Sequence, residues 1–473
     1  MDKKRGISRR SLLRDGAAAA AGGAALLSQT RAVLGQPPAV VTRSRFRAWI
    51  SRGDGPGRTT LQEAALRPIT GRQVLVRTEA TNLCYTLVPA VLGLAAPQPA
   101  TAAQAPPAAP AAGALAPPPS QRRTNDMAMI QGHGGVGVVE AVGPEVRRVQ
   151  VGDRVCVSGT PHCGACYRCL RGRSDMCQFL SAIGPDDLVA IADLADGTPV
   201  YQNSHIGGLA EVMVAFEEWV VPIFTTKPAA EVGMVCGCTS VAGLGATAAH
   251  GLVAIEPASS VAVVGCGPIG LSAVQGARIA GATTIIAIDP IAARRQVALA
   301  VGATHALDPN AEGDGLVDKV RSLTTWPTDR LWAGGRNPGG RRPGSGADFV
   351  IEAAGLDAVA PRAERGPDPT GVLAMQQAYR MTALGGHLVT TGLIRGDIVL
   401  PGNLFSFGGV THHSGQAGGC SPMRDIPRFV ELLERGRFDA RSLATAVVPL
   451  ERMLEGYEQV AYRTTITGIM TVS

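Results

Sequence analysis

The sequence predicts an α/β protein in which a β-rich region precedes a doubly wound parallel sheet. In the second half, apolar runs alternate with helical stretches, and one run leads into a glycine-rich turn. In the first part, short β-rich segments lie between glycine and proline clusters, which predicts a separate β-rich domain. With 473 residues, the chain is long enough for two or three domains, each with its own core.

The two regions differ in the pattern that predicts their elements. Residues 46–50 and 73–77 are short β-rich runs in the first region. From about residue 240, the apolar runs suit strands that are buried on both faces. The expected buried strands are 261–264, 284–288 and 348–351. The expected helices are 269–280, 292–301, 427–435 and about 450–460.

Two stretches are predicted to be surface insertions. Residues 94–119 are mostly alanine and proline, a composition that cannot bury enough apolar surface to fold. Residues 326–346 are rich in glycine, proline and arginine and are expected to form another loop. The Ala/Pro-rich insertion either reshapes the entrance to a site or loops away from it, and the sequence leaves both alternatives open.

The N-terminus is typical of a twin-arginine export signal. A basic segment, 8–14, contains Arg9 and Arg10, and a weakly apolar stretch of alanine and glycine follows at 16–27. A signal over residues 1–32 predicts a periplasmic or extracellular protein, or a cytoplasmic one when the signal is not used. The alternative is a basic N-terminal arm. Elsewhere no window offers eighteen uninterrupted apolar residues, so we expect no integral membrane segment in the mature chain.

The charge does not indicate a nucleic-acid partner. The formal net charge is +6, and part of that excess comes from basic residues within the first fourteen positions. Aromatic residues make up only 4%, which provides little material for stacking bases. We therefore expect no nucleic-acid partner.

The glycine-rich turn has the spacing of a dinucleotide-binding fingerprint. Its first glycine allows the tight turn, its second lets the backbone approach a pyrophosphate, and its third lets the helix pack against the strand. Nineteen residues after the third glycine, Asp289 follows the next strand and suits the adenosine ribose, which favours NAD over NADP. Nearby Arg294 and Arg295 weaken that preference. The predicted cofactor-binding residues here are Gly265, Gly267, Pro268, Ile269, Gly270, Asp289 and Arg294.

Four cysteines lie within fifteen residues at the spacing C-x2-C-x2-C-x7-C: Cys163, Cys166, Cys169 and Cys177. Four thiolates at this spacing can complete a tetrahedral shell with no open position, which predicts a structural zinc site. In an exported protein two disulfides are the alternative, and an iron–sulfur cluster is a further one. Two-residue gaps favour the metal, because they strain a disulfide.

Together with these features, three scattered positions and several motifs resemble the zinc-dependent medium-chain alcohol dehydrogenases. The motifs are Gly132-His133 before a glycine-rich turn, 151–155, the cysteine lobe 163–177, Gly237-Cys238 and 346–355. The resemblance covers the chain from about residue 45 onward. It implies a GroES-like catalytic domain over 44–239, a Rossmann domain over 240–417 and a return to the catalytic domain over 418–473.

The resemblance also implies the chemistry. Cys84, His133 and Cys238 match the catalytic zinc ligands, with Cys236 a competitor that lacks the family's spacing. The expected cofactors are two zinc ions per chain and NAD, and the expected substrate is an alcohol or aldehyde. Thr86 matches the hydroxyl that relays the alcohol proton, and Arg463 matches an arginine at the cofactor pyrophosphate. The family further implies a homodimer or homotetramer.

Two departures leave other functions open. Gly134 stands where the family usually has glutamate, and Leu87 stands where an acidic residue usually orients the histidine. One alternative is therefore an exported binding or sensor protein with a degenerate catalytic zinc site. Independently of these departures, segments 195–201 and 207–212 resemble the glutathione-linked formaldehyde-type dehydrogenases, which are another alternative. A third alternative is a reductase of activated double bonds. Because NAD is scarce outside the cytoplasm, an exported enzyme is expected to keep its NAD and use an external electron acceptor.

Overall fold

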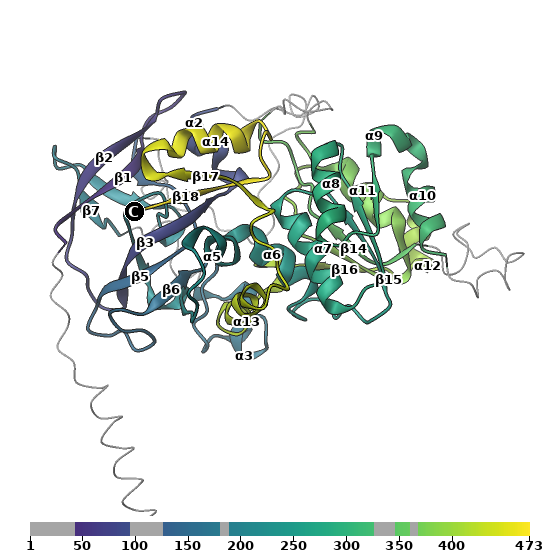
Figure 1. The fold of residues 1–473 in the computed structure, drawn as a ribbon, viewed down its shortest axis with the longest axis horizontal. Coiled ribbons are helices and arrows are strands. Elements are labelled where there is room, and N and C mark those ends of the chain that lie inside the picture. Colours follow the sequence, from purple (N-terminus) through teal and green to yellow (C-terminus); the bar gives the residue numbers. More distant parts are fainter. Residues whose placement is uncertain (1–42, 95–125, 180–188, 326–345, 360–367) are drawn as a thin grey trace, which may run out of the picture. The chain divides into compact units, whose positions relative to one another are not determined.

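The computed structural model describes residues 43–94, 126–179, 189–325, 346–359 and 368–473 (Figure 1). The predicted signal over 1–32 and nearly all of the insertions at 94–119 and 326–346 lie outside these residues. Nothing in the structure therefore bears on those three predictions.

The first part of the chain forms a closed barrel and an adjoining mixed sheet. The barrel order is β1-β2-β7-β8-β4. Its strands are β1 (Arg45–Ser51), β2 (Thr59–Leu66), β4 (Ala128–Ile130), β7 (Ala192–Asp193) and β8 (Pro199–Gln202). The second sheet has the order β10-β6-β5-β3-β18-β17, with β9 also paired to β3. Its strands are β3 (Gln73–Leu83), β5 (Gly135–Val142), β6 (Arg154–Val157), β9 (Val212–Phe216), β10 (Val220–Pro222), β17 (Ala444–Pro449) and β18 (Thr467–Thr471).

The third sheet has six parallel strands in the order β13-β12-β11-β14-β15-β16. The strands are β11 (Ser260–Val264), β12 (Thr284–Ile288), β13 (His305–Leu307), β14 (Ala347–Glu352), β15 (Thr382–Thr390) and β16 (Thr411–Ser414). This is the doubly wound dinucleotide-binding order: successive strands are added on one side from β11 to β13, and then on the other side from β14 to β16. The predicted fold class is confirmed, and all three expected buried strands are present.

Helices flank these sheets and connect them (Figure 1). The α-helices are α2 (Val88–Leu92), α3 (Tyr167–Leu170), α5 (Ala229–Cys236), α6 (Cys238–Thr247), α7 (Pro268–Ala280), α8 (Ala292–Val301), α9 (Pro309–Glu312), α10 (Leu316–Leu323), α11 (Val372–Met381), α12 (Gly402–Phe407), α13 (Pro422–Glu434) and α14 (Met453–Ala461). The 3-10 helices are η1 (Tyr85–Leu87), η3 (Ser174–Met176), η5 (Asn203–His205), η6 (Glu217–Trp219), η7 (Gly313–Gly315), η9 (Gln416–Gly419) and η10 (Leu450–Arg452). The predicted helix at 292–301 has the observed bounds, whereas that at 427–435 begins earlier, at Pro422.

Burial on both faces explains why the central strand is uniformly apolar. Val261 and Val263 of β11 face a core that contains residues of α7 and α8. The alternate residues Ala262 and Val264 face a second core, which contains residues of α10 and α11. Because successive side chains of a strand point to opposite faces, both sets must be apolar.

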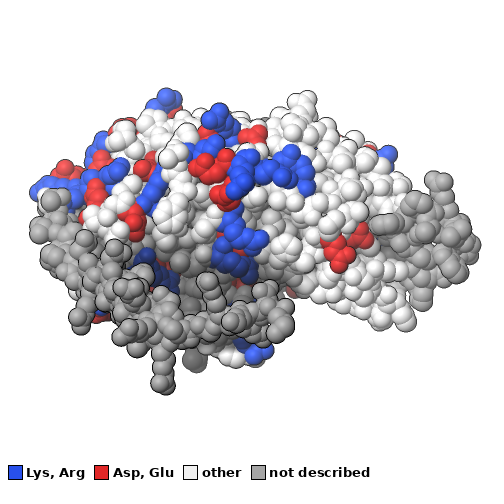
Figure 2. Space-filling view, turned by 60° about the horizontal axis from the view of Figure 1, so that its bottom comes forward, with Lys and Arg blue, Asp and Glu red and all other residues white. Residues whose placement is uncertain are grey.

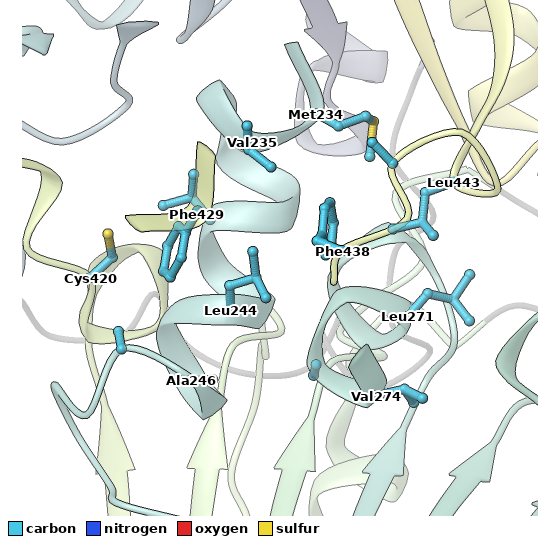
Figure 3. Close-up of a cluster of buried hydrophobic side chains, with 14 of the residues drawn as sticks. Met234, Val235, Leu244, Ala246, Leu271, Val274, Cys420, Phe429, Phe438 and Leu443 are labelled. Atoms are coloured by element: carbon cyan, nitrogen blue, oxygen red, sulfur yellow. The ribbon is translucent and has the colours of Figure 1, made fainter. Parts of the chain in front are cut away.

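The larger of the two cores joins the parallel sheet to the middle and C-terminal parts of the chain. Figure 3 shows Leu244 of α6 and Phe429 of α13 converging with Phe438, which follows α13. Phe438 is only 1% exposed. The C-terminal segment therefore contributes to the same core as the dinucleotide-binding sheet.

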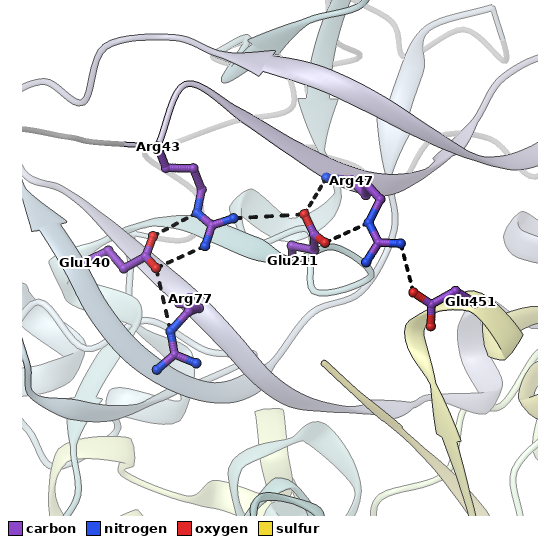
Figure 4. A network of polar contacts seen from close by, with 6 residues as sticks. All are labelled: Arg43, Arg47, Arg77, Glu140, Glu211 and Glu451. Atoms are coloured by element: carbon purple, nitrogen blue, oxygen red, sulfur yellow. Dashed lines mark hydrogen bonds and ion pairs between the residues drawn. The ribbon is translucent and has the colours of Figure 1, made fainter. Parts of the chain in front are cut away.

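Ion pairs connect elements on the surface of the β-rich part (Figure 4). Arg47 of β1 lies 2.8 Å from Glu211 and 2.9 Å from Glu451 of η10. Arg43 lies 3.0 Å from Glu140 of β5. Solvent screens such exposed pairs strongly, so they stabilise the return of the C-terminal segment only modestly.

The surface in Figure 2 shows basic and acidic side chains side by side, and much of the face carries neither. Among the described residues, no single helix is long and apolar enough to span a membrane. The bent pair of α5 and α6 passes that test by length and composition only.

We expect Phe438→Ala to lower the free energy of unfolding by about 3–5 kcal/mol, because it removes a large side chain from a close-packed core. Chemical denaturation of the purified protein measures the change. The matched control is Phe224→Ala, since the Phe224 side chain is 89% exposed and its loss leaves no cavity. Equal effects of the two substitutions would contradict the assigned core.

Candidate active site

Three predicted ligands from separate parts of the chain converge at one point. Cys84 follows β3, His133 lies between β4 and β5, and Cys238 begins α6. Their ligand atoms all lie within 4.8 Å of one another. Cys84 is buried, and the other two are half-buried. One imidazole nitrogen and two sulfurs at this separation fit the donor set of a zinc ion with an open fourth position.

A buried hydrogen bond ties the two cysteine-bearing segments together. The Asn82 side-chain amide of β3 donates to the Thr239 hydroxyl of α6 at 2.8 Å. A Cβ at Gly237, between α5 and α6, would lie 2.1 Å from the Asn82 amide nitrogen. The close approach therefore requires glycine directly before the ligand cysteine. Asn82 and Thr239 were not predicted, because no motif or spacing distinguishes them in the sequence.

Close backbone packing also places His133. Gly132 has a φ of +101°, and a Cβ there would lie 2.7 Å from the backbone nitrogen of Gly208. The Thr81 hydroxyl of β3 donates to the carbonyl of Gly134, the residue after the histidine. The His133 segment is thus held against β3, the strand that delivers Cys84.

The three ligands influence one another electrostatically. A hydrogen bond with Cys238 and the charge of His133 hold the pKa of the Cys84 thiol well below its usual value, although burial opposes this. Burial, the largest single effect, lowers the pKa of His133, but the charge of the Cys84 thiolate and a hydrogen bond with it together raise that pKa above its usual value. Thr86 is exposed as a residue, and its hydroxyl lies 3.2 Å from the Cys84 sulfur. The site therefore favours a thiolate at Cys84 and has a hydroxyl beside it.

The unusual residues around the site have structural explanations. Leu87 has no carboxylate that could orient His133, and its side chain is buried in an apolar cluster with Val88 and Tyr457. A Cβ at Gly134 would lie 3.2 Å from the Val157 carbonyl, so a larger residue there requires the backbone to move. The competitor Cys236 lies in the core, where its carbonyl accepts a hydrogen bond from the Cys156 thiol at 3.1 Å.

The four-cysteine lobe brings its sulfur atoms together in the same way. The sulfurs of Cys163, Cys166, Cys169 and Cys177 lie within 4.8 Å of one another. All ten cysteines of the chain are free, so the structure does not contain the alternative disulfides. Although burial raises it, backbone N–H groups of Cys169 and Gln178 lower the pKa of Cys166 to about 6. Backbone N–H groups directed at thiolate sulfur favour the deprotonated form that a metal requires.

The glycine-rich turn has the geometry that its spacing predicts. Gly265 has a φ of +91°, and a Cβ there would lie 2.6 Å from the backbone nitrogen of Ala354. A Cβ at Gly270 would lie 1.8 Å from the Gly265 carbonyl oxygen. Gly267 precedes α7, in which Pro268 is the first residue. The N-terminus of α7 therefore presents backbone N–H groups suited to phosphate.

Acidic and basic side chains surround this turn. The Asp289 carboxylate accepts hydrogen bonds from the backbone N–H groups of Cys266 at 2.7 Å and Ile291 at 2.8 Å. Arg294 lies beside the turn, with a terminal nitrogen 3.9 Å from where a Gly267 Cβ would lie. Arg295 is 3.1 Å from Asp308, so it already has an acidic partner. Of the two adjacent arginines, Arg294 is the one placed toward the phosphate-binding end.

Glu352 is a further buried group that sequence reasoning missed. It ends β14 at the carboxyl edge of the parallel sheet and accepts hydrogen bonds from Ala354 and Gly355 at 2.9 and 2.8 Å. Burial raises the pKa of its carboxyl group, while these backbone N–H groups oppose the shift. The Thr391 N–H donates to the Glu352 carbonyl at 2.8 Å, so this residue joins two loops of the edge where the dinucleotide site lies.

The fold and the converging ligands together define an oxidoreductase of the dehydrogenase class. Comparison with known families agrees: residues 70–225 match the alcohol dehydrogenase GroES-like domain, and residues 268–435 match the zinc-binding dehydrogenase family. The chain belongs to the medium-chain alcohol dehydrogenase family. Its relatives support a general function as an oxidoreductase that acts on alcohols.

Individual relatives cover most of the described chain. The NDMA-dependent alcohol dehydrogenase of Amycolatopsis methanolica is 30% identical over 72% of this chain and 84% of its own length. The geraniol dehydrogenase of Castellaniella defragrans is 33% identical over 67% and 76%. Among solved structures, an alcohol dehydrogenase zinc-binding domain protein from Burkholderia ambifaria matches with a TM-score of 0.70, at 26% identity over 91% of this chain and 99% of that one.

Proposed function

We propose that the protein is a zinc- and NAD-dependent alcohol dehydrogenase that interconverts an alcohol with an aldehyde or ketone. The observation that carries this proposal is the convergence of Cys84, His133 and Cys238 within 4.8 Å. When bound there, zinc supplies Lewis-acid activation of the alcohol oxygen, and NAD supplies the hydride acceptor. The four-cysteine lobe would hold a second, structural zinc ion.

The chain's own residues have distinct roles in this proposal. Cys84, His133 and Cys238 would hold the metal, and the Thr86 hydroxyl accepts the alcohol proton while it donates its own proton to water. The N-terminus of α7, together with Arg294 and Arg463, binds the cofactor pyrophosphate. Asp289 accepts hydrogen bonds from the adenosine ribose and repels a 2′-phosphate, which favours NAD over NADP.

We further propose that the twin-arginine segment exports the folded protein with its NAD bound. An exported dehydrogenase must then return its electrons to an external acceptor, because free NAD is scarce outside the cytoplasm. One relative's name states a dependence on NDMA, which is consistent with a requirement for a compound besides the nicotinamide.

We expect the purified protein to contain about two zinc ions per chain, since each ligand set binds one ion. Cys238→Ser should lose about one equivalent of zinc and alcohol oxidation together, because it removes one of only three ligands at the catalytic site. Elemental analysis by mass spectrometry, alongside turnover of an alcohol panel, measures both. Cys236→Ala is the matched control and should keep both ions. One zinc ion in the wild type, with no turnover of any alcohol, would support the sensor alternative instead.

Replacing the Thr86 hydroxyl should slow proton transfer without displacing the metal. We expect Thr86→Val to lower kcat by about 10²–10⁴-fold with little change in KM, whereas Thr86→Ser retains the hydroxyl and most of the activity. Steady-state kinetics measures the difference, and zinc content should remain at the wild-type level in both variants. Equal activity of the valine and serine variants would exclude the relay.

The exported protein should contain close to one nicotinamide per chain when it is isolated without added cofactor. The physical reason is that the cofactor binds before export and has no external pool from which to rebind. Absorbance and mass spectrometry of the denatured supernatant measure it. An exported protein that is empty and exchanges added NAD freely would contradict retention.

Replacing both Arg9 and Arg10 by lysine should keep the protein inside the cell, and export of this double variant would contradict the twin-arginine route.

A further inference from the structure

Three segments that are distant in sequence meet beside the candidate active site. They are η1 directly after Cys84, the loop that follows β14, and the turn that follows α14. The Tyr85 hydroxyl donates to the carbonyl of Val359 at 3.3 Å and accepts from the Val359 backbone N–H at 3.2 Å. The Arg463 guanidinium pairs with the Asp357 carboxylate and lies 5.2 Å from the centre of the Tyr85 ring. We call Tyr85, Asp357, Val359 and Arg463 the clasp.

The charged part of the clasp is almost completely enclosed. The Asp357 side chain has no exposed surface, and that of Arg463 is 11% exposed. The second carboxylate oxygen of Asp357 accepts the backbone N–H of Asp368 at 2.5 Å. Arg463 has a φ of +57°, which is unusual for a residue with a side chain. A long, flexible guanidinium is therefore fixed by an ion pair on one side and by an aromatic ring on its flat face.

The clasp lies next to the glycine-rich turn. The Ala354 backbone, in the same loop as Asp357, approaches Gly265 so closely that a Cβ there would lie 2.6 Å from the Ala354 nitrogen. Burial lowers the pKa of the Arg294 guanidinium, and the positive charge of Arg463 lowers it further. Arg294 in turn lies beside Gly267, at the N-terminus of α7. Two guanidinium groups and a helix N-terminus thus share one region that suits the pyrophosphate of a dinucleotide.

We propose that Asp357 and Tyr85 are positioning residues that hold Arg463 over the dinucleotide pyrophosphate and so set the rate at which bound cofactor leaves. This inference rests on the proposed NAD-binding function. Arg463 is already ordered before it meets the phosphate, so binding loses little side-chain entropy. For the cofactor to leave, Arg463 must move away, which requires that the ion pair with Asp357 opens. The clasp also joins the segment after Cys84 to the loop after β14, so its opening loosens the cofactor and metal sites together.

The test measures release of NADH from the full-length protein by stopped-flow fluorescence, with excess NAD as the displacing ligand. Asp357→Asn keeps the size of the side chain but removes its charge, and we expect release to accelerate about tenfold or more. Tyr85→Phe keeps the ring beneath Arg463 but removes both hydrogen bonds to Val359. We expect it to accelerate release about three- to tenfold, and because it removes a single oxygen atom it changes the packing little.

Two controls separate this role from a general loss of stability. Tyr379→Phe alters a buried tyrosine packed against α10 and the parallel sheet, and it should release NADH at the wild-type rate. In an Arg463→Ala background, Asp357→Asn should add no further acceleration, because it acts through the arginine. Two results would overturn this inference while leaving the proposed function intact. One is NADH release at the wild-type rate in both Asp357→Asn and Tyr85→Phe. The other is an undiminished acceleration by Asp357→Asn in the Arg463→Ala background. Failure of the wild type to bind NADH would overturn the proposed function as well.

Discussion

The hydrogen bond between Asn82 and Thr239 is the contact on which the candidate active site depends. It joins the end of β3 to the start of α6, and each partner lies within two residues of a ligand cysteine. The missing side chain at Gly237 allows the two segments to approach this closely. A buried amide and hydroxyl that lost this bond would each remain without a partner, at a cost of about 1–3 kcal/mol per group. The same contact therefore stabilises the fold and sets the spacing of two metal ligands.

The dinucleotide site depends on close backbone approach at a second place. Gly265 and Gly270 let the turn after β11 pack against its neighbours, which directs the N-terminus of α7 toward the carboxyl edge of the parallel sheet. Glu352 joins the loops after β14 and β15 at that edge, and Arg463 reaches it from the C-terminal segment. Arg463 follows α14, which packs in the apolar cluster that contains Leu87, whereas α13 packs into the larger core. The position of Arg463 is therefore tied to the packing of the C-terminal segment in both clusters.

Several parts of the site could be predicted from the sequence because local spacing carries the information. The four cysteines and the glycine-rich turn are each confined to a short stretch, so their geometry follows from a few backbone angles. The scattered ligands were identified only through the resemblance to a family, since nothing local relates Cys84 to His133 or Cys238. Arg463 was also identified through that resemblance, and Glu352 lies within the motif 346–355 without an assigned role. Asn82, Thr239, Tyr85 and Asp357 had no such signal, because an isolated polar residue gives no indication of its partner.

By itself, the sequence determined the fold class, three of the strands of the parallel sheet and the two compact motifs. These follow from hydrophobic periodicity and from residue types, such as glycine at positive φ, that few alternatives can replace. Only the tertiary structure decided which distant groups meet: Asn82 with Thr239, and Arg463 with Asp357. The physical reason is that a side-chain hydrogen bond or ion pair is specified by three-dimensional proximity, which chain folding creates between residues more than one hundred positions apart.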